Sequence, residues 1–319
     1  MAQAVVADVG SFSSRFGLVG DAQPRGFFLS SVGVKGSSSS KSSGGMGDYI
    51  FDIRENWENV RIENPIPANG IISDWDLWGA IHSHGLKAYL KTDFSEQPLY
   101  LTEKAVAASH EKQLLLNRKK ACEIMFEKNS VPALYFGKDA AAACYATGRT
   151  TGVVADLGFH GSTVAPVIDG YVESSQVLSN SIGGKFLDLY MAGLLRGQKI
   201  DLVPPFRVTH EVPPGMSSQI KYKPVDRKNV HPSYDEFMSL EIARDLKEAV
   251  CLMSNKPALQ NHQLSSLPAI PYELPDGHLI NIGANRYMVS ESVCHPSAPP
   301  LSADAGTKLS SSEIAHINE

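Results

Sequence analysis

The sequence predicts a mixed α/β fold in which one structural plan occurs twice. Residues 5–10 read VVADVG and residues 153–158 read VVADLG, so a strand, an acid and a glycine turn recur in the same order. Between and after these strings, segments with helical spacing alternate with short apolar strands. The chain has 319 residues, of which 43% are hydrophobic, so it can bury a sizeable core and has the length of about two domains.

The two repeated strings predict two β-hairpins. The first runs from Val5–Gly10 into a second strand at Arg15–Val19, and the other runs from Val153–Gly158 into Thr163–Ile168. If the hairpins face each other, their acids can hold a hydrated divalent cation and their turn amides can cradle phosphate oxygens. The two hairpins therefore predict a phosphate clamp. The alternative is that a common strand-turn string recurs by chance.

Helical spacing predicts helices over Asp74–Leu90, Glu111–Glu127 and Asp139–Ala146, the last ending before Gly148, a favourable C-cap residue. Further along, Ser233 and Glu236 fit a capping box that would begin another helix. Its apolar stripe consists of Phe237, Leu240, Ala243, Leu246 and Val250. Strands are expected at Tyr272–Ile282 and Arg286–Val289, around a turn at Gly283–Asn285.

Three stretches are predicted to be irregular. Residues 36–47 are rich in Ser and Gly, which is typical of a flexible loop. Pro204–Asn229 is rich in proline and basic residues, which favours an exposed insertion. The tail at residues 297–319 shows no packed element.

Composition excludes several classes of function. The chain carries 29 Lys and Arg against 34 Asp and Glu, a net charge of −5, which argues against a protein that mainly grips nucleic acid. Its longest apolar runs are too short to span a membrane, and an acid near the N-terminus argues against a signal peptide. The four cysteines show no metal-binding spacing, and we expect reduced thiols.

Six strings, in order along the chain, resemble actin and its relatives. The first hairpin resembles actin's first phosphate loop, and the Asp156-Leu157-Gly158 string lies where the second begins. The other strings are residues 69–76 (NGIISDWD), 132–135 (PALY) with 146–152 (ATGRTTG), 244–248 (RDLKE) and 272–277 (YELPDG). Residues 9–12 (VGSF), 51–56 (FDIREN) and 200–206 (IDLVPPF) are most similar to the fourth nuclear actin-related class, the BAF-type actin-like proteins.

This resemblance implies an actin-like two-domain fold, with duplicated ribonuclease H-like sheets around a nucleotide cleft. The first domain would span residues 1–148 with a small insertion at about 32–69. The second would span 149–296 with an inserted subdomain at about 183–268. The resemblance covers residues 4–297 and then stops, so we expect a fold whose C-terminal part is missing. Because the family's adenosine-closing Gly-Gly loop would be absent, weaker nucleotide binding is expected.

The resemblance also implies where a nucleotide and Mg²⁺ would bind. Its phosphates would meet Gly10, Ser11, Phe12 and Arg15 in the first loop and Gly158 in the second. Phe12 replaces a glycine of actin and would crowd a close backbone approach, and Arg15 replaces a lysine with a planar fork. Asp8 and Asp156 would hold Mg²⁺ through water. The alternative is a loop that keeps its turn and binds nothing.

The nucleoside would contact the string at residues 244–248. Arg244, Lys247 and Glu248 share one face of a helix, and Gly184 would allow a helix to approach the ribose and base. A charged cluster on a helix is otherwise a solvated face.

The residues that arrange the attacking water in actin are replaced here. Asp139 occupies the position of a glutamine, Thr163 that of a histidine, and Phe159 that of one acid around the metal. Asp139 could act as a base or could cap its helix. His82 and His84 have the spacing of a metal pair, but no third ligand is nearby in the sequence.

Loss of the hydrolytic residues favours an interaction subunit over an enzyme. The resemblance implies a non-catalytic subunit of a chromatin-remodelling or histone-acetyltransferase complex in the nucleus, with ATP and Mg as weak or structural ligands. Its partners would be a helical segment of a remodelling ATPase and actin or another actin-related protein. We expect no sequence-specific contact with nucleic acid and no membrane association. The alternatives are an active ATPase or small-molecule kinase of the same superfamily and a filament-forming cytoskeletal actin.

Overall fold

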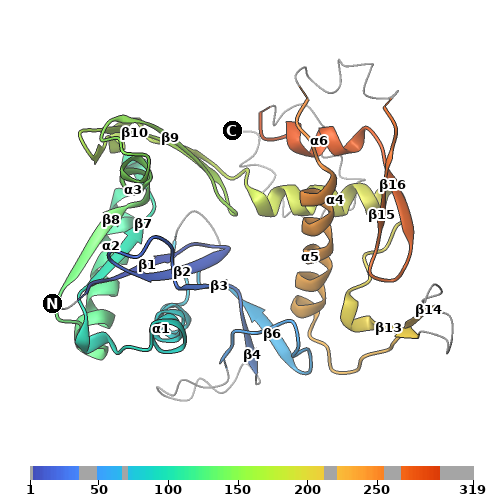
Figure 1. Ribbon diagram of the computed structural model, residues 1–319, viewed down its shortest axis with the longest axis horizontal. Coiled ribbons are helices and arrows are strands. Elements are labelled where there is room, and N and C mark those ends of the chain that lie inside the picture. The colour runs from blue at the N-terminus through green and yellow to red at the C-terminus, as the bar shows by residue number, and fades with distance from the viewer. Residues whose placement is uncertain (1–2, 36–48, 67–70, 212–220, 255–266, 295–319) are drawn as a thin grey trace. The chain divides into compact units, whose positions relative to one another are not determined.

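A computed structural model describes residues 3–35, 49–66, 71–211, 221–254 and 267–294. Both repeated strings form the predicted hairpins (Figure 1). In the first, β1 (Val5–Val9) pairs antiparallel with β2 (Ser13–Leu18), and Asp8 lies opposite Arg15. In the second, β9 (Gly152–Leu157) pairs with β10 (Ser162–Ile168), and Asp156 lies opposite Thr163.

The first hairpin belongs to a five-stranded sheet of order β3-β2-β1-β7-β8. Strands β1, β7 and β8 are parallel, so their carboxyl ends meet at one edge. The second hairpin belongs to a sheet in which β10 pairs with β9, β11 and β12. The further strands of these two sheets are β3 (Gly26–Leu29), β7 (Leu99–Glu103), β8 (Leu134–Lys138), β11 (Tyr171–Val172) and β12 (Leu178–Asn180).

Smaller sheets use the remaining described strands, in the orders β5-β4-β6, β13-β14 and β15-β16. These strands are β4 (Val32–Lys35), β5 (Tyr49–Ile50), β6 (Val60–Glu63), β13 (Val208–Glu211), β14 (Lys221–Pro224), β15 (Ile270–Glu273) and β16 (Leu279–Ile282).

The helices follow the apolar spacing of the sequence closely in the first half of the chain. Asp74 caps α1 by accepting a hydrogen bond from the Leu77 amide, and α1 continues into a π-helical segment at Gly85–Leu90. Likewise α2 continues into a π-helical segment at Glu123–Lys128, and Gly148 adopts the left-handed conformation just after α3. The helices are α1 (Trp75–His84), α2 (Glu111–Cys122), α3 (Asp139–Ala146), α4 (Gly184–Gly197), α5 (Pro232–Val250) and α6 (Asn285–Glu291). Single 3₁₀ turns occupy Phe94–Glu96, Ala108–His110, Ser174–Gln176 and Pro205–Arg207.

Two local predictions in the second half of the chain were wrong. The Ser233–Glu236 capping box does not form, because Pro232 begins α5 and His231 is its cap, accepting from the Ser233 amide at 3.2 Å. The strand expected at Arg286–Val289 is part of α6, and the hairpin turns earlier, at Gly277. Gly277 has a φ of 81°, which a glycine adopts without strain.

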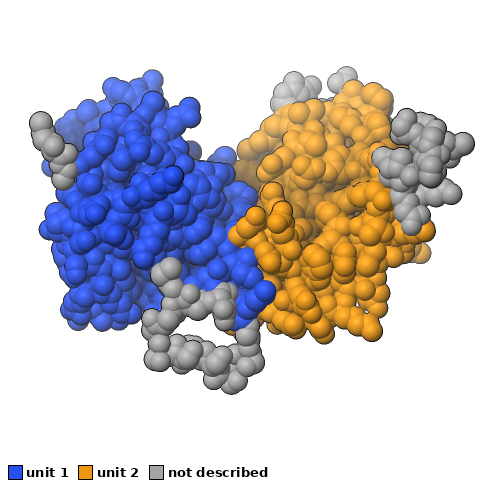
Figure 2. All heavy atoms as spheres, turned by 60° about the horizontal axis from the view of Figure 1, so that its bottom comes forward, with its two compact units in different colours: residues 1–51, 63–181 blue, residues 52–62, 182–319 orange. Residues whose placement is uncertain are grey.

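The chain forms two compact units, coloured separately in Figure 2. Unit 1 comprises Met1–Phe51 and Glu63–Ser181, and unit 2 comprises Asp52–Ile62 and Ile182–Glu319. The predicted boundary at residue 148 falls inside unit 1, because α3 packs on the sheet of β9 and β10. The predicted domains at 1–148 and 149–296 stay predictions. The predicted loop at 36–47 and the tail at 297–319 lie outside the described residues, as do 212–220 of the predicted insertion.

Each unit buries its own apolar core. In unit 1, Phe16, Leu77 and Ile81 belong to a cluster between α1 and the five-stranded sheet. In unit 2, α4, α5 and α6 pack together around residues such as Met191 and Leu246. The segment 52–62 joins unit 2 through the hydroxyl of Tyr234, which donates to the Ile53 carbonyl at 2.8 Å. No described helix has the length and apolar character that a membrane crossing requires.

The sheet around β10 buries one face and exposes the other. Ala165 and Val167 are buried against Ala140 and Ala141 of α3. The opposite face is apolar and is left uncovered by the described residues. Its exposed side chains are Val153, Leu157, Val164, Ile168, Tyr171 and Leu178.

His82 is a buried titratable group in the core of unit 1, and it makes the stability of this unit depend on pH. Its imidazole is 1% exposed, and burial lowers its pKa to about 4, although a hydrogen bond with the Trp78 carbonyl opposes the shift. Because the unfolded chain then binds a proton at a higher pH than the folded chain, stability is lost as pH falls from 6.5 toward 4. We expect a loss of on the order of 1 kcal/mol between pH 7 and pH 5.5.

Urea unfolding at both pH values tests this expectation. A His82→Gln variant should lose most of the pH dependence, and it keeps a remainder because burial also lowers the pKa of His84. His110→Gln changes an exposed histidine of the same unit and is the matched control. An unchanged pH dependence in His82→Gln would contradict the prediction.

Candidate functional site

The edge where the three parallel strands end brings together Asp8, which was predicted as a metal ligand, and Asp139, which was predicted at a hydrolytic position. Asp8 lies near the end of β1, Thr102 near the end of β7, and Asp139 directly after β8. The Thr102 hydroxyl donates to Asp8 Oδ1 at 2.6 Å. The amide of Ala105, just beyond β7, donates to Asp139 Oδ1 at 2.8 Å. Asp8, Thr102 and Asp139 are far apart in the sequence. They lie at one edge of the sheet because their strands are parallel neighbours.

The first loop is a tight turn between β1 and β2. The Gly10 amide donates to the Ser13 carbonyl at 3.1 Å, and a Cβ on Gly10 would lie only 3.2 Å from that oxygen. The carbonyl of Ser11 accepts a hydrogen bond from the Asn64 side chain at 2.7 Å. The turn is therefore well supported, but the Gly10 amide is already used within it.

Arg15 and Asp8, predicted for phosphate and metal respectively, are paired with each other. They lie opposite each other on adjacent strands, and Arg15 Nη1 is 3.1 Å from Asp8 Oδ2. Both side chains are partly exposed, at 50% and 37%, so this ion pair adds little stability. The pair uses one nitrogen of the guanidinium and one carboxylate oxygen, while the Thr102 hydroxyl donates to the other oxygen.

The second loop repeats the design of the first. The Gly158 amide donates to the Gly161 carbonyl at 3.0 Å, as Gly10 donates to Ser13. Gly161 has no room for a side chain, because a Cβ there would lie 2.3 Å from the Asn180 carbonyl oxygen. Asp156 is exposed, whereas its cross-strand neighbour Thr163 is buried, and its hydroxyl has no hydrogen-bond partner among the described residues.

Lys104 is a residue of this site that the sequence analysis missed. Its Nζ lies 4.0 Å from the position that a Cβ on Gly158 would take, and Asp156 Oδ2 lies 3.6 Å from the same position. Lys104 directly follows β7. Its place after the central parallel strand was the signal that could have identified it.

Asp139 is the first residue of α3, after the N-cap Lys138, and its side chain joins this helix to the chain beyond β7. Its Oδ1 accepts from the Ala140 amide at 2.7 Å and from the Ala105 amide at 2.8 Å. Burial raises the pKa of Asp139, and the nearby Asp156 adds to this effect, while the two amides and Lys104 oppose it. The sequence left open a base or a cap-like role for Asp139, and these contacts correspond to a cap-like role, in which its carboxylate accepts two backbone amides at the start of α3.

Phe12 and Phe159 bring the tips of the two hairpins into contact. Their ring centroids are 5.2 Å apart, with the ring planes inclined at 45°. Phe159 also lies against the neighbouring His160, at 4.9 Å between centroids. The two loops therefore face each other, which is the condition for the phosphate clamp, and the rings of Phe12 and Phe159 lie between them.

The residues predicted to contact the nucleoside all lie in unit 2. Two of them, Arg244 and Lys247, form ion pairs with Asp188. Arg244 Nε is 3.0 Å from Asp188 Oδ2, and Lys247 Nζ is 2.7 Å from Asp188 Oδ1. Asp188 is 1% exposed on α4, and burial raises its pKa while both cations oppose that shift. Arg244 also pairs with Glu241.

Asp188 is the second residue that the sequence analysis missed. The signal was an acid among the apolar positions of α4, next to Phe186 and Tyr190. Glu248 is exposed, and Gly184 is the first residue of α4. Arg244 and Lys247 are thus anchored to a buried acid rather than lying on a solvated face.

These arrangements offer few protein ligands to a nucleotide triphosphate and its metal. The described residues contain no group of three or more potential metal ligands, so Mg²⁺ would depend on water and phosphate oxygens. Of its two predicted acids, Asp8 is already engaged by Arg15 and Thr102. The turn amides of Gly10 and Gly158 already donate hydrogen bonds within their own turns.

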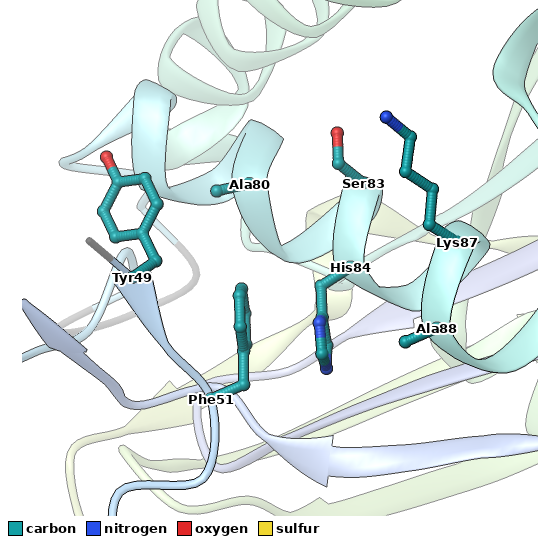
Figure 3. Close-up of a pocket in the computed structure, with 7 residues that line it drawn as sticks. All are labelled: Tyr49, Phe51, Ala80, Ser83, His84, Lys87 and Ala88. Atoms are coloured by element: carbon teal, nitrogen blue, oxygen red, sulfur yellow. The ribbon is translucent and has the colours of Figure 1, made fainter. Parts of the chain in front are cut away.

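A separate hollow of about 290 Å³ lies beside α1 (Figure 3). His84 stacks on Phe51 there with ring centroids 3.8 Å apart, and Lys87 lies on the same wall. His82, by contrast, is in the core, with its Nδ1 2.8 Å from the Trp78 carbonyl. The two histidines therefore have separate packing roles and are not gathered around one metal position.

Comparisons with known proteins agree with the order of the motifs. Residues 1–314 match the protein-family model described as Actin. The chain is 31% identical to Actin-related protein 4 of Arabidopsis thaliana, over 92% of this chain and 70% of that protein. It is 28% identical to Actin-related protein 4 of Yarrowia lipolytica, over 94% and 69%. It is 26% identical to the SWI/SNF and RSC complexes subunit arp42 of Schizosaccharomyces pombe, over 92% and 69%.

Proposed function

Because the chain belongs to the actin family, we propose that it is a non-catalytic, nuclear actin-related subunit of a chromatin-remodelling or histone-acetyltransferase complex. The actin-like fold and the similarity to the fourth actin-related class, both predicted from the motifs, are confirmed. One relative is named as a subunit of the SWI/SNF and RSC complexes, which supports a place in such an assembly.

The observation that carries the non-catalytic assignment is the role of Asp139. Hydrolysis requires a residue that orients or deprotonates an attacking water. Asp139 stands at the position of that residue, yet its Oδ1 holds the amides of Ala105 and Ala140. Thr163, at the second such position, is a buried side chain. ATP with Mg, where it binds, would be a structural ligand that contributes binding energy to the fold.

The proposed partners follow from the resemblance. They are a helical segment of a remodelling ATPase and actin or another actin-related protein. A net charge of −5 argues against direct, sequence-specific contact with nucleic acid.

An active ATPase of the same superfamily is the alternative that one observation favours. Burial and the neighbouring Asp156 raise the pKa of Asp139, as a general base requires. The hydrolysis experiment described in the Discussion separates the two.

Affinity purification followed by mass spectrometry tests the proposed assembly. We expect the tagged full chain to recover the ATPase and several other subunits of one remodelling or acetyltransferase complex from a nuclear extract. The Asp188→Ala variant, in which unit 2 should be destabilised, is expected to lose these partners. Recovery of only chaperones and proteasome subunits by the wild-type chain would contradict the proposal.

A further inference from the structure

Arg286, on α6 of unit 2, carries a buried guanidinium with unused hydrogen-bond donors. The residue is 6% exposed, and its Nη2 donates to the hydroxyl of Tyr287 at 3.1 Å. The Nε and Nη1 atoms are buried and have no hydrogen-bond partner among the described residues. The guanidinium also lies over the Tyr287 ring, with Cζ 4.9 Å from the ring centroid. Tyr287 therefore holds the guanidinium in place, while two of its three nitrogens still lack an acceptor.

A guanidinium in this state is unfavourable, because arginine keeps its charge and burial removes the water that would otherwise accept its hydrogen bonds. In the part of the chain that the structure describes, Nε and Nη1 reach no carboxylate oxygen. The buried acid of the same helix, Glu291, is five residues further on, about 140° round the helix axis. The two side chains therefore leave α6 on different sides, and Arg286 needs another source of negative charge.

The surroundings of Arg286 are positively charged as well as buried. Burial raises the pKa of the Cys251 thiol to about 11, and the positive charges of Lys247 and Arg286 both oppose that shift. Both cations therefore act on one place, at the end of α5. The acid that pairs with Lys247 is Asp188, and it is already shared with Arg244. An anion beside Arg286 would thus be attracted by Lys247 too.

The donors of this place match an oxyanion. A guanidinium presents Nε with Nη2 on one edge and Nη1 with Nη2 on the other, and either edge fits two oxygens of a phosphate, a sulfate or a carboxylate. The Tyr287 hydroxyl accepts from Nη2 and keeps its own hydrogen, which it can donate to a bound oxygen. Because Arg286 is 6% exposed, a small free ion reaches it more easily than a phosphate carried by a larger molecule.

We propose that Arg286 and the Tyr287 hydroxyl form a binding site for a free, compact oxyanion of the phosphate type in unit 2. The bound ion neutralises the guanidinium and accepts the hydrogen bonds that the described residues leave unmade. It thereby stabilises α6, which packs against α4 and α5. The site belongs to unit 2 alone, so it depends neither on the hairpin loops of unit 1 nor on membership of a complex.

Equilibrium dialysis of the full chain against inorganic phosphate, at constant ionic strength, tests this site, and thermal unfolding supplies a second readout. The wild-type chain should bind about one ion, and its Tm should rise by about 5 °C at about a hundred times Kd. O-phosphoserine carries the same phosphate on a larger group and should not displace the ion. Arg196→Met removes an exposed arginine of the same unit and should bind phosphate as the wild type does.

Arg286→Met should bind phosphate at least about tenfold more weakly. In phosphate-free buffer it should be at least as stable as the wild type, because an apolar side chain of similar length replaces a buried charge that has no partner. Tyr287→Phe keeps the ring and should weaken phosphate binding by about threefold. This second variant decides the question if Arg286→Met does not fold.

Three results would overturn this inference. They are an absence of saturable phosphate binding by the wild type, binding by Arg286→Met or Tyr287→Phe as tight as that of the wild type, and displacement of phosphate by an equal concentration of O-phosphoserine. The last result would mean that the site takes the phosphate group of a larger molecule rather than a free ion.

Discussion

Replacement of Asp188 by alanine should destabilise unit 2 by about 3–5 kcal/mol, because it breaks a buried ion-pair cluster from its centre. Asp188 is 1% exposed and accepts from both Arg244 and Lys247, whose side chains are 11% and 15% exposed. Without the carboxylate, Lys247 would remain largely buried with its charge uncompensated, and Arg244 would keep its pairing with Glu241. The lost attraction is smaller than the cost of leaving these charges buried.

Urea unfolding, followed by circular dichroism, measures this loss. Asp188→Asn keeps the size of the side chain and one hydrogen-bond acceptor, so its loss should be smaller than that of alanine. Asp201→Ala removes an exposed acid of the same unit and should stay within about 0.5 kcal/mol of wild type. If Asp188→Ala unfolds at the same urea concentration as wild type, the ion-pair cluster around Asp188 does not stabilise unit 2 and the prediction is wrong.

The second large effect concerns hydrolysis. We expect the wild-type chain to release no phosphate from ATP above background, and we expect Asp139→Gln to release none either. A positioned base accelerates such a step by about 10²–10⁴-fold, so its presence would be unmistakable. The structure places the Asp139 carboxylate on two backbone amides, and Phe159 replaces an acid expected around the metal.

The same variants distinguish a cap from a base. Asp139→Ala leaves the Ala105 and Ala140 amides without their acceptor, which should cost about 1–2 kcal/mol of stability. Asp139→Asn keeps an oxygen at this place and should cost less. Removing the negative charge in Asp139→Gln should preserve or tighten ATP binding. Clear turnover in wild type that disappears in Asp139→Gln would reverse the assignment and favour the ATPase.

The sequence alone predicted several local features of this protein correctly. The strings at residues 5–10 and 153–158 predicted two hairpins with an acid near the end of the first strand, and both form. The helix over Asp139–Ala146 begins and ends where predicted. These features depend on neighbouring residues, since strand alternation, helical spacing and glycine turns are local properties of the chain.

The partners of the site residues were decided by the tertiary structure. Asp188 meets Arg244 only because α4 and α5 pack together, and Phe12 meets Phe159 only because the two hairpins belong to one unit. The resemblance implies a phosphate contact for Arg15, which stays a prediction, and the strand register places Arg15 opposite Asp8. The sequence determines the charge and shape of each side chain. Whether that side chain can contact a ligand or pairs with another side chain depends on which distant segment the fold brings next to it.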